Sequence, residues 1–232
     1  MNCIPAANPI AMEKEPIDVD EIFRRLRHAT AGMPKAAMFE LRDRGYGGAF
    51  EQLVAALISA RTRDETTIPI CMRLFAHART PERLLSLDEP KLVDLLRGAT
   101  FAEAKARDLR QIARQIQEEY SGRVPDTVEE LTSFRGVGPK IAALTIGVAY
   151  DKPAIAVDVH VHRVTNRWGY VAASTPEKTL AQLKHKLPKR YWIEINERLV
   201  PFGKFVCKGV QPKCSTCLLL SICRQVGVTG HR

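Results

Sequence analysis

Apolar side chains recur at helical spacing along almost the whole chain. From Phe50 to Ile58 they fall at intervals of three and four residues, as on the buried face of an amphipathic helix. Three further segments open with a Thr or Asp followed within two residues by Pro, at Thr80, Asp88 and Thr175, which is the signature of a capped helix start. β–α alternation is missing, which excludes a doubly wound fold. The pattern therefore predicts an all-α protein.

Two segments need a closer reading. Residues 155–161 alternate like a strand, but Val157, Val161, Val164 and Trp168 also share one helical face. Because a single strand in a helical chain has no partner, we predict a loop that leads into a helix. A shorter helix is predicted to start at residues 125–126, with Glu129 placed for a capping box, and to end before a glycine turn.

Composition narrows the class of protein. The 232 residues are 45% hydrophobic and 26% charged, which is ordinary for a folded protein of one or two domains. The net charge of +9 favours an anionic partner, nucleic acid before membrane. No apolar run approaches the roughly 18 residues of a membrane span. Residues 1–16 lack the pattern of a secretory signal, so we expect a flexible tail and a cytoplasmic protein.

The turn Gly136-Val137-Gly138-Pro139-Lys140 has the form of a helix-hairpin-helix motif. A glycine turn that opens a helix presents backbone N–H groups to a phosphate at the positive end of the helix dipole. The dipole also disfavours the ammonium form of Lys140, which makes this amine a candidate nucleophile. The turn alone fits a plain αα-hairpin equally well, and a lysine beside a phosphate is more often a charge contact. Asp158 alone fits a helix cap or an ion-pair partner.

Four of the six cysteines lie close together near the C-terminus, in the spacing C-x6-C-x2-C-x5-C. A chain of this size without a secretory signal is a poor candidate for disulfides. Four thiolates in a short loop suit either zinc or a [4Fe–4S] cluster, and the spacing by itself leaves both open. The predicted metal ligands are Cys207, Cys214, Cys217 and Cys223.

The hairpin, followed by Val157-Asp158-Val159-His160, resembles the endonuclease III family of DNA glycosylases over residues 17–223 or so. The resemblance implies two helical lobes that flank a DNA-binding cleft. A six-helix domain, 42–152, would carry the hairpin, and an iron–sulfur domain would combine 17–41 with 153–232. It implies a monomer acting on duplex DNA of the nucleoid, and a [4Fe–4S] cluster as cofactor.

The same resemblance implies a reaction. Lys140 would attack C1′ of the sugar, displace the base and form a Schiff base, and β-elimination would then nick the strand, with Asp158 as electrostatic support. We therefore expect a bifunctional glycosylase and AP lyase acting on oxidised pyrimidines in base excision repair. The alternatives are a mismatch thymine or uracil glycosylase of the same superfamily, and a metal-bearing DNA-binding protein without catalysis.

Further DNA contacts follow from the resemblance. Arg61 stands where the family commonly has glutamine, which fills the gap left by the extruded nucleotide, and arginine pairs most readily with a facing guanine. Phe101 is the candidate second wedge, and His160 is expected at the lesion pocket or, equally, as a satisfied buried histidine. The remaining predicted DNA contacts lie in the hairpin and the cysteine loop: Gly136, Val137, Gly138, Lys208 and Lys213.

Overall fold

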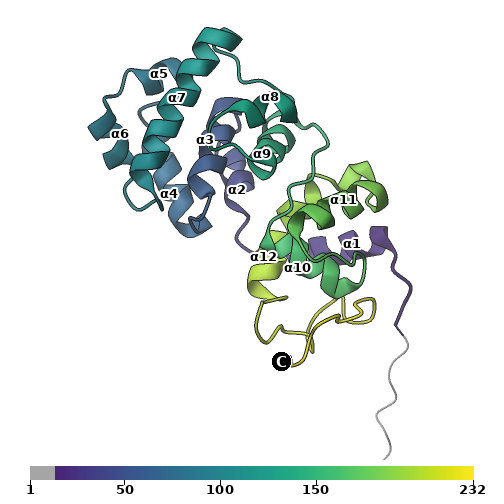
Figure 1. Cartoon of the computed structure of the whole chain (residues 1–232). Coiled ribbons are helices and arrows are strands. Elements are labelled where there is room, and N and C mark those ends of the chain that lie inside the picture. Colours follow the sequence, from purple (N-terminus) through teal and green to yellow (C-terminus); the bar gives the residue numbers. More distant parts are fainter. Residues whose placement is uncertain (1–13) are drawn as a thin grey trace, which may run out of the picture.

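The computed structural model describes residues 14–232, and in this range it is helical without a strand, as the sequence predicted. The helices form two lobes joined side by side (Figure 1). Their bounds are α1 Val19–Ala29, α2 Ala37–Asp43, α3 Ala49–Ser59, α4 Asp64–Phe75, α5 Pro81–Leu85, α6 Glu89–Leu95, α7 Ala102–Tyr120, α8 Val128–Ser133, α9 Pro139–Tyr150, α10 Val159–Trp168, α11 Pro176–Lys186, the 3₁₀ turn η1 Lys189–Tyr191 and α12 Glu194–Phe205.

Side-chain caps start several helices where the sequence predicted them. The hydroxyl of Thr80 accepts from Arg83 N at 3.2 Å, and a carboxylate oxygen of Asp88 accepts from Lys91 N at 2.8 Å. Helix α8 starts later than predicted, because its cap is Thr127, which accepts from the backbone N–H of Glu130. The predicted capping box with Glu129 is therefore wrong by one residue, because the acidic residue three positions after the observed cap is Glu130.

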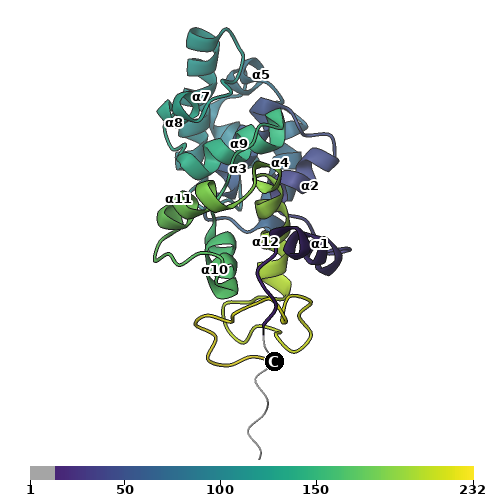
Figure 2. The ribbon, with the colours of Figure 1, turned by 90° about the vertical axis from the view of Figure 1, so that its right-hand side faces the viewer.

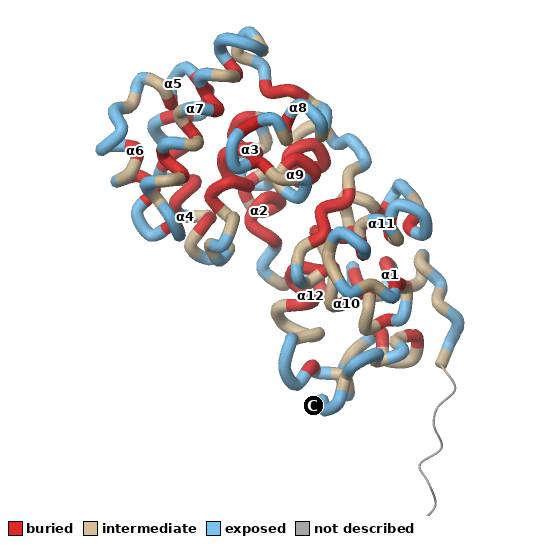
Figure 3. The backbone as a smooth tube through the Cα atoms, viewed as in Figure 1, coloured by how far each residue is buried: buried red, intermediate tan, exposed pale blue. Residues whose placement is uncertain are grey.

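The first lobe has one continuous apolar core. Helices α2 to α9 all contribute to it, and α3 packs against α9 at its centre (Figure 3). Leu53, Leu84 and Leu131 are completely inaccessible to solvent. Truncating such a leucine to alanine costs about 2–5 kcal/mol. Eight helices share this core, where the sequence predicted six.

The second lobe takes its core from both ends of the chain. Helix α1 contributes Phe23 and Leu26, which pack with α10, α11 and α12. The ring of Phe23 stacks on Tyr191 with centroids 3.9 Å apart. After α12 the chain runs to Arg232 in turns, and Leu219 and Ile222 bury themselves in the same core.

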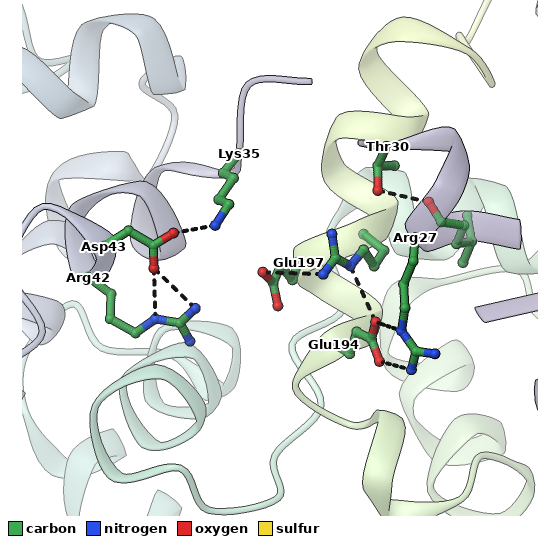
Figure 4. A network of polar contacts seen from close by, with 9 residues as sticks. Arg27, Thr30, Lys35, Arg42, Asp43, Glu194 and Glu197 are labelled. Carbon is green, nitrogen blue, oxygen red and sulfur yellow. Dashed lines mark hydrogen bonds and ion pairs between the residues drawn. The ribbon is translucent and has the colours of Figure 1, made fainter. Parts of the chain in front are cut away.

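The boundary between the lobes falls between α1 and α2 (Figure 4). Arg27 of α1 makes a bidentate ion pair with Glu194 of α12, at 2.7 Å for each nitrogen. Across the connection, Gln52 Nε2 of α3 donates to Met38 O of α2 at 3.2 Å, and the buried side chains of α2 belong to the first core. Helix α2 thus packs in the first lobe, and the predicted domain boundary at residue 42 is too late.

The predicted flexible tail lies largely outside the described residues. Its last three residues, 14–16, are held in place, because Lys14 Nζ donates to Leu220 O at 2.8 Å and Glu15 N donates to Ser221 O at 2.9 Å. These contacts attach the start of the described chain to the cysteine loop.

The two lobes contact each other directly (Figure 2). Ala156 and Val200 belong to the second half of the chain but pack in the first core. Asn196 Nδ2 donates to Ala156 O at 3.3 Å, and Lys204 Nζ of α12 reaches Asp64 at the start of α4 at 2.6 Å. Side chains of both lobes therefore meet over a shared surface. None of the helices in residues 14–232 combines the length and apolar character needed to cross a bilayer.

Candidate active site

The hairpin joins α8 to α9 through residues 134–138. Gly136 has φ +79°, the left-handed region that glycine adopts without cost, and a Cβ there would lie 3.3 Å from Asp108 Oδ2. Val137 between the glycines is buried in the core. Gly138 is different, since a Cβ there would meet nothing within 4 Å. Internal packing does not require this second glycine, whose backbone lies open at the N-terminus of α9.

Lys140 occupies the second position of α9, after Pro139 at the first. A proline is at home there, because the first N–H groups of a helix have no partner within it. The lysine side chain is exposed, and Nζ makes no hydrogen bond or ion pair with any residue in 14–232. The amine is thus available to a ligand.

Asp158 is the N-cap of α10. Its Oδ1 accepts from His160 N at 2.9 Å and from Val161 N at 2.8 Å. Oδ2 makes no hydrogen bond within the described part of the chain. One oxygen therefore fixes the start of the helix while the other remains available, so the cap and the predicted catalytic role do not compete.

Lys140 and Asp158 line the same open cavity, of about 900 Å³, and come from opposite lobes. A smaller cavity of about 290 Å³ adjoins it and also includes Lys140; its wall is mostly apolar, with Ile141, Leu144 and Leu180. The arrangement offers an amine and a carboxylate at the mouth of a hollow that can take a flat, partly apolar group.

Arg61 and Phe101 meet at the rim of the first lobe. The Arg61 guanidinium lies 5.8 Å from the centroid of the Phe101 ring, and Phe101 is 61% exposed. Both residues have left-handed backbones, with φ +58° and +59°. Arg61 also lines the larger cavity. A cation and an aromatic ring side by side suit contact with nucleobases.

Comparison with known proteins identifies this architecture. Residues 54–189 match the model of the HhH-GPD superfamily of base excision DNA repair proteins. The chain is 42% identical to endonuclease III of Thermotoga maritima over 174 residues, covering 75% of this chain and 82% of that one. It is 36% identical to endonuclease III of Bacillus subtilis over 180 residues, covering 76% and 81%.

The chain belongs to the endonuclease III family. A solved non-covalent endonuclease III–DNA complex superimposes with a TM-score of 0.78 at 28% identity, over 89% of this chain and 94% of that one. The chain spans 63% of the chicken endonuclease III-like protein 1 and 47% of an Arabidopsis thaliana homologue, so these relatives are considerably longer.

His160 lines the cavity of Lys140 and Asp158, and its ring packs against Gly203 of α12. A Cβ at Gly203 would stand 2.5 Å from its Nδ1, so only glycine leaves room for the ring. Arg163 Nη2 lies 3.1 Å from Nδ1, which makes that nitrogen the acceptor and leaves the proton on Nε2. Burial lowers the pKa of His160. It is a neutral, largely packed histidine at the edge of the site.

The four cysteines of this endonuclease III relative are free and line a single cavity in the loop after α12. Gln225 N donates to Cys223 Sγ at 3.4 Å, and Arg167 Nη1 lies 3.5 Å from Cys207 Sγ. Within residues 14–232 no three metal-ligating side chains converge closely enough to hold an ion as they stand. The cysteines surround a space rather than meet at a point.

The two predicted loop lysines lie apart from the hairpin residues, in the cysteine loop. Lys213 is exposed, whereas Lys208 is half-buried and its carbonyl accepts from Arg167. Neither lines the cavity of Lys140 and Asp158.

Sequence reasoning missed the charged group on the floor of the cavity. Lys204 Nζ binds Asp64 at 2.6 Å and Glu65 at 3.2 Å, and all three line the cavity. Burial works against the ammonium of Lys204, but the two carboxylates outweigh it and raise its pKa. The acidic pair at 64–65 begins α4, but no residue pattern indicates that Lys204, 139–140 residues later, reaches it.

Proposed function

We propose that the protein is a bifunctional DNA glycosylase and AP lyase that removes oxidised pyrimidines from duplex DNA in base excision repair. The observation that carries the proposal is the shared cavity, in which an unengaged lysine of the hairpin lobe faces the same space as a capping aspartate of the other lobe. Family membership supplies the chemistry in outline: these are base excision DNA repair proteins.

Lys140 is the nucleophile in this proposal. Its Nζ bonds to C1′ while the glycosidic bond breaks and the base leaves with that electron pair. Opening of the sugar gives an imine between Nζ and C1′. Loss of a C2′ proton then expels the 3′ phosphate, and water releases the amine. Only an amine forms an imine, so the lyase step needs a lysine here. A solved relative at 28% identity, described as a trapped endonuclease III–DNA covalent intermediate, supports this course.

Asp158 assists from the opposite wall. Its free oxygen stabilises positive charge that develops on the sugar and accepts protons during the elimination. Its capped oxygen keeps the carboxylate in a fixed position, because two backbone N–H groups hold it. The extruded nucleotide would lie in the 900 Å³ cavity, and the apolar recess behind Lys140 would accept its base.

Duplex DNA would lie across the hairpin and the rim. The open N-terminus of α9 suits a phosphate, and the exposed Arg61–Phe101 pair suits the gap left by the extruded nucleotide. The protein would act as a monomer, with Lys208 and Lys213 touching the backbone further along.

The four cysteines are proposed to hold a [4Fe–4S] cluster. A single zinc needs all four sulfurs about 2.3 Å from one point, whereas thiolates arranged around a cavity suit a cluster of several atoms. The cluster would hold the loop after α12 together and, through it, the lysines of that loop. Iron and sulfide in the protein purified without oxygen support this; zinc without iron overturns it.

A panel of duplexes tests the function. It contains thymine glycol, dihydrouracil, uracil and a plain abasic site, each incubated with the protein and resolved for strand cleavage. We expect cleavage at the two oxidised or reduced pyrimidines and at the abasic site. Cleavage at the abasic site alone reduces the protein to a lyase, and action on mismatched uracil alone makes it a mismatch glycosylase. Binding without any cleavage leaves only a DNA-binding protein.

A further inference from the structure

Lys105 carries a charge in the interior of the first lobe. The residue is 8% exposed, and its Nζ donates to Ile58 O at 2.6 Å, to Ala60 O at 2.8 Å and to Thr62 Oγ1 at 3.2 Å. An ammonium group has three protons, so all of them are used. The acceptors lie at and beyond the C-terminal end of α3, where helix carbonyls have no partner within the helix.

These contacts hold the backbone on both sides of Arg61. Thr62 Oγ1, which accepts from Lys105, also accepts from Thr100 N at 3.2 Å, and Thr100 Oγ1 donates to Arg61 O at 2.8 Å. One ammonium therefore connects the turn that carries Arg61 to the turn that carries Phe101. Arg61 and Phe101 each have a left-handed φ, which is strained for a non-glycine residue and persists only where its surroundings enforce it.

Helix α7 aligns this connection with the hairpin. Phe101 is the N-cap of α7, and Lys105 and Asp108, three residues apart, are neighbours on one face of that helix. Asp108 binds Arg135 of the hairpin at 3.0 Å and also lies beside Gly136. The same helix face thus fixes the rim pair at one end and the turn before Lys140 at the other.

Placing the ammonium group of Lys105 at the C-terminal end of α3 has a free-energy cost. Burial lowers the pKa of Lys105 to about 8, which reflects the cost of keeping an ammonium away from water. Water or an ordinary turn would satisfy the same carbonyls at less cost. The cost is explained if the two strained turns must keep one geometry.

We propose that Lys105 is a positioning residue that clamps Arg61 and Phe101 into the geometry in which they fill the gap in duplex DNA opposite the extruded nucleotide. The inference rests on the proposed function. It adds a residue that touches neither DNA nor the reacting atoms, and it assigns the strain in the two turns a purpose. The clamp acts only where there is a gap to fill, so its loss affects duplex substrates and spares single strands.

The test compares Lys105→Met with Arg110→Met on two substrates. Arg110 lies on the same helix and donates to Leu87 O, away from both strained turns, so it controls for loss of a cation bound to backbone. The substrates are an abasic site in a duplex and the same site in a single strand. For Lys105→Met we expect kcat/KM to fall about tenfold on the duplex and to stay within about twofold on the single strand, since a displacement of about 1 Å can cost up to about a hundredfold. Arg110→Met should leave both unchanged.

Thr100→Val keeps the test decisive if Lys105→Met does not fold. Thr100 is exposed, and the change removes only the hydroxyl that donates to Arg61 O. We expect a smaller loss, again confined to the duplex. Equal losses on both substrates, or no loss in either variant, would overturn the clamp. Failure of the unaltered protein to nick any abasic DNA would instead overturn the proposed function.

Discussion

The two lobes differ in what stabilises each of them internally. The first has a continuous apolar core from α2 to α9, and its charged rim is fixed by a buried lysine. In the second, a smaller core from both ends of the chain is followed by a 27-residue stretch, residues 206–232, without a helix. Backbone contacts such as Lys213 N to Val206 O and Arg232 N to Pro212 O hold that stretch, and the four cysteines lie within it.

The two lobes contribute different residues to the site. The lobe that is stable by its own packing carries the amine and the rim pair, which have to be placed accurately. The lobe that depends on its loop carries the aspartate, the cysteines and the loop lysines. Neither half has a complete site, because the cavity forms only where Lys140 of one lobe and Asp158 of the other face each other.

The largest effect is expected from removing a cysteine of the loop. Cys214→Ala should abolish iron binding and destabilise the second lobe by several kcal/mol, because metal-binding free energy is folding free energy in such a loop. Cys71→Ala is the control: it is buried in the first core, and its loss should cost only about 1 kcal/mol and leave the iron content intact. Thermal unfolding with iron analysis measures both. Equal destabilisation by the two variants contradicts the contrast between the lobes.

The next effect concerns Asp158. Asp158→Asn should keep the cap on α10 and hence the stability, since asparagine caps as well as aspartate, but should lower the rate about 10²–10³-fold. Asp88→Asn, at the matching N-cap of α6 in the first lobe, should change neither. Single-turnover cleavage beside urea unfolding separates the roles. Full activity of Asp158→Asn would reduce the residue to a helix cap.

A smaller effect is expected at Arg61, within the first lobe alone. Arginine offers only donors, which match the two acceptors of guanine, whereas glutamine offers a donor and an acceptor, which match adenine. Arg61→Gln should therefore shift the ratio of rates on dihydrouracil opposite guanine and opposite adenine about tenfold toward adenine. Arg63→Gln, two residues on, is the control. An unchanged ratio shows that Arg61 does not contact the facing base.

Much of the first lobe follows from sequence, and less of the site does. Thr80 and Asp88 predict the starts of their helices because a helix cap involves only residues that are close in sequence. The glycine turn predicts the hairpin for the same reason. Helix α2 was not predicted from the sequence, since it is short and has no side-chain cap. The two roles of Asp158 could not be separated from the sequence, because a helix cap and a cavity carboxylate call for the same residue type. Only the fold shows that Oδ1 caps α10 while Oδ2 remains available.

The role of Lys105 lies furthest from sequence reasoning. The residue falls within an amphipathic helix, where a lysine is ordinarily solvated. Two of its partners are backbone carbonyl oxygens 45 and 47 residues away, which no residue type reveals, and the third is the hydroxyl of Thr62, 43 residues away. The left-handed φ of Arg61 and Phe101 could not be predicted from the sequence either, because glycine is the residue that usually indicates such turns.

Borohydride trapping on an abasic duplex tests the central claim, that the hairpin amine bonds to the sugar. The unaltered protein and Lys178→Gln, which removes an exposed lysine in the first turn of α11, should each give a covalent protein–DNA adduct. Lys140→Gln should give none while still binding the duplex. An adduct of undiminished yield from Lys140→Gln, or its absence from the unaltered protein, would contradict the account.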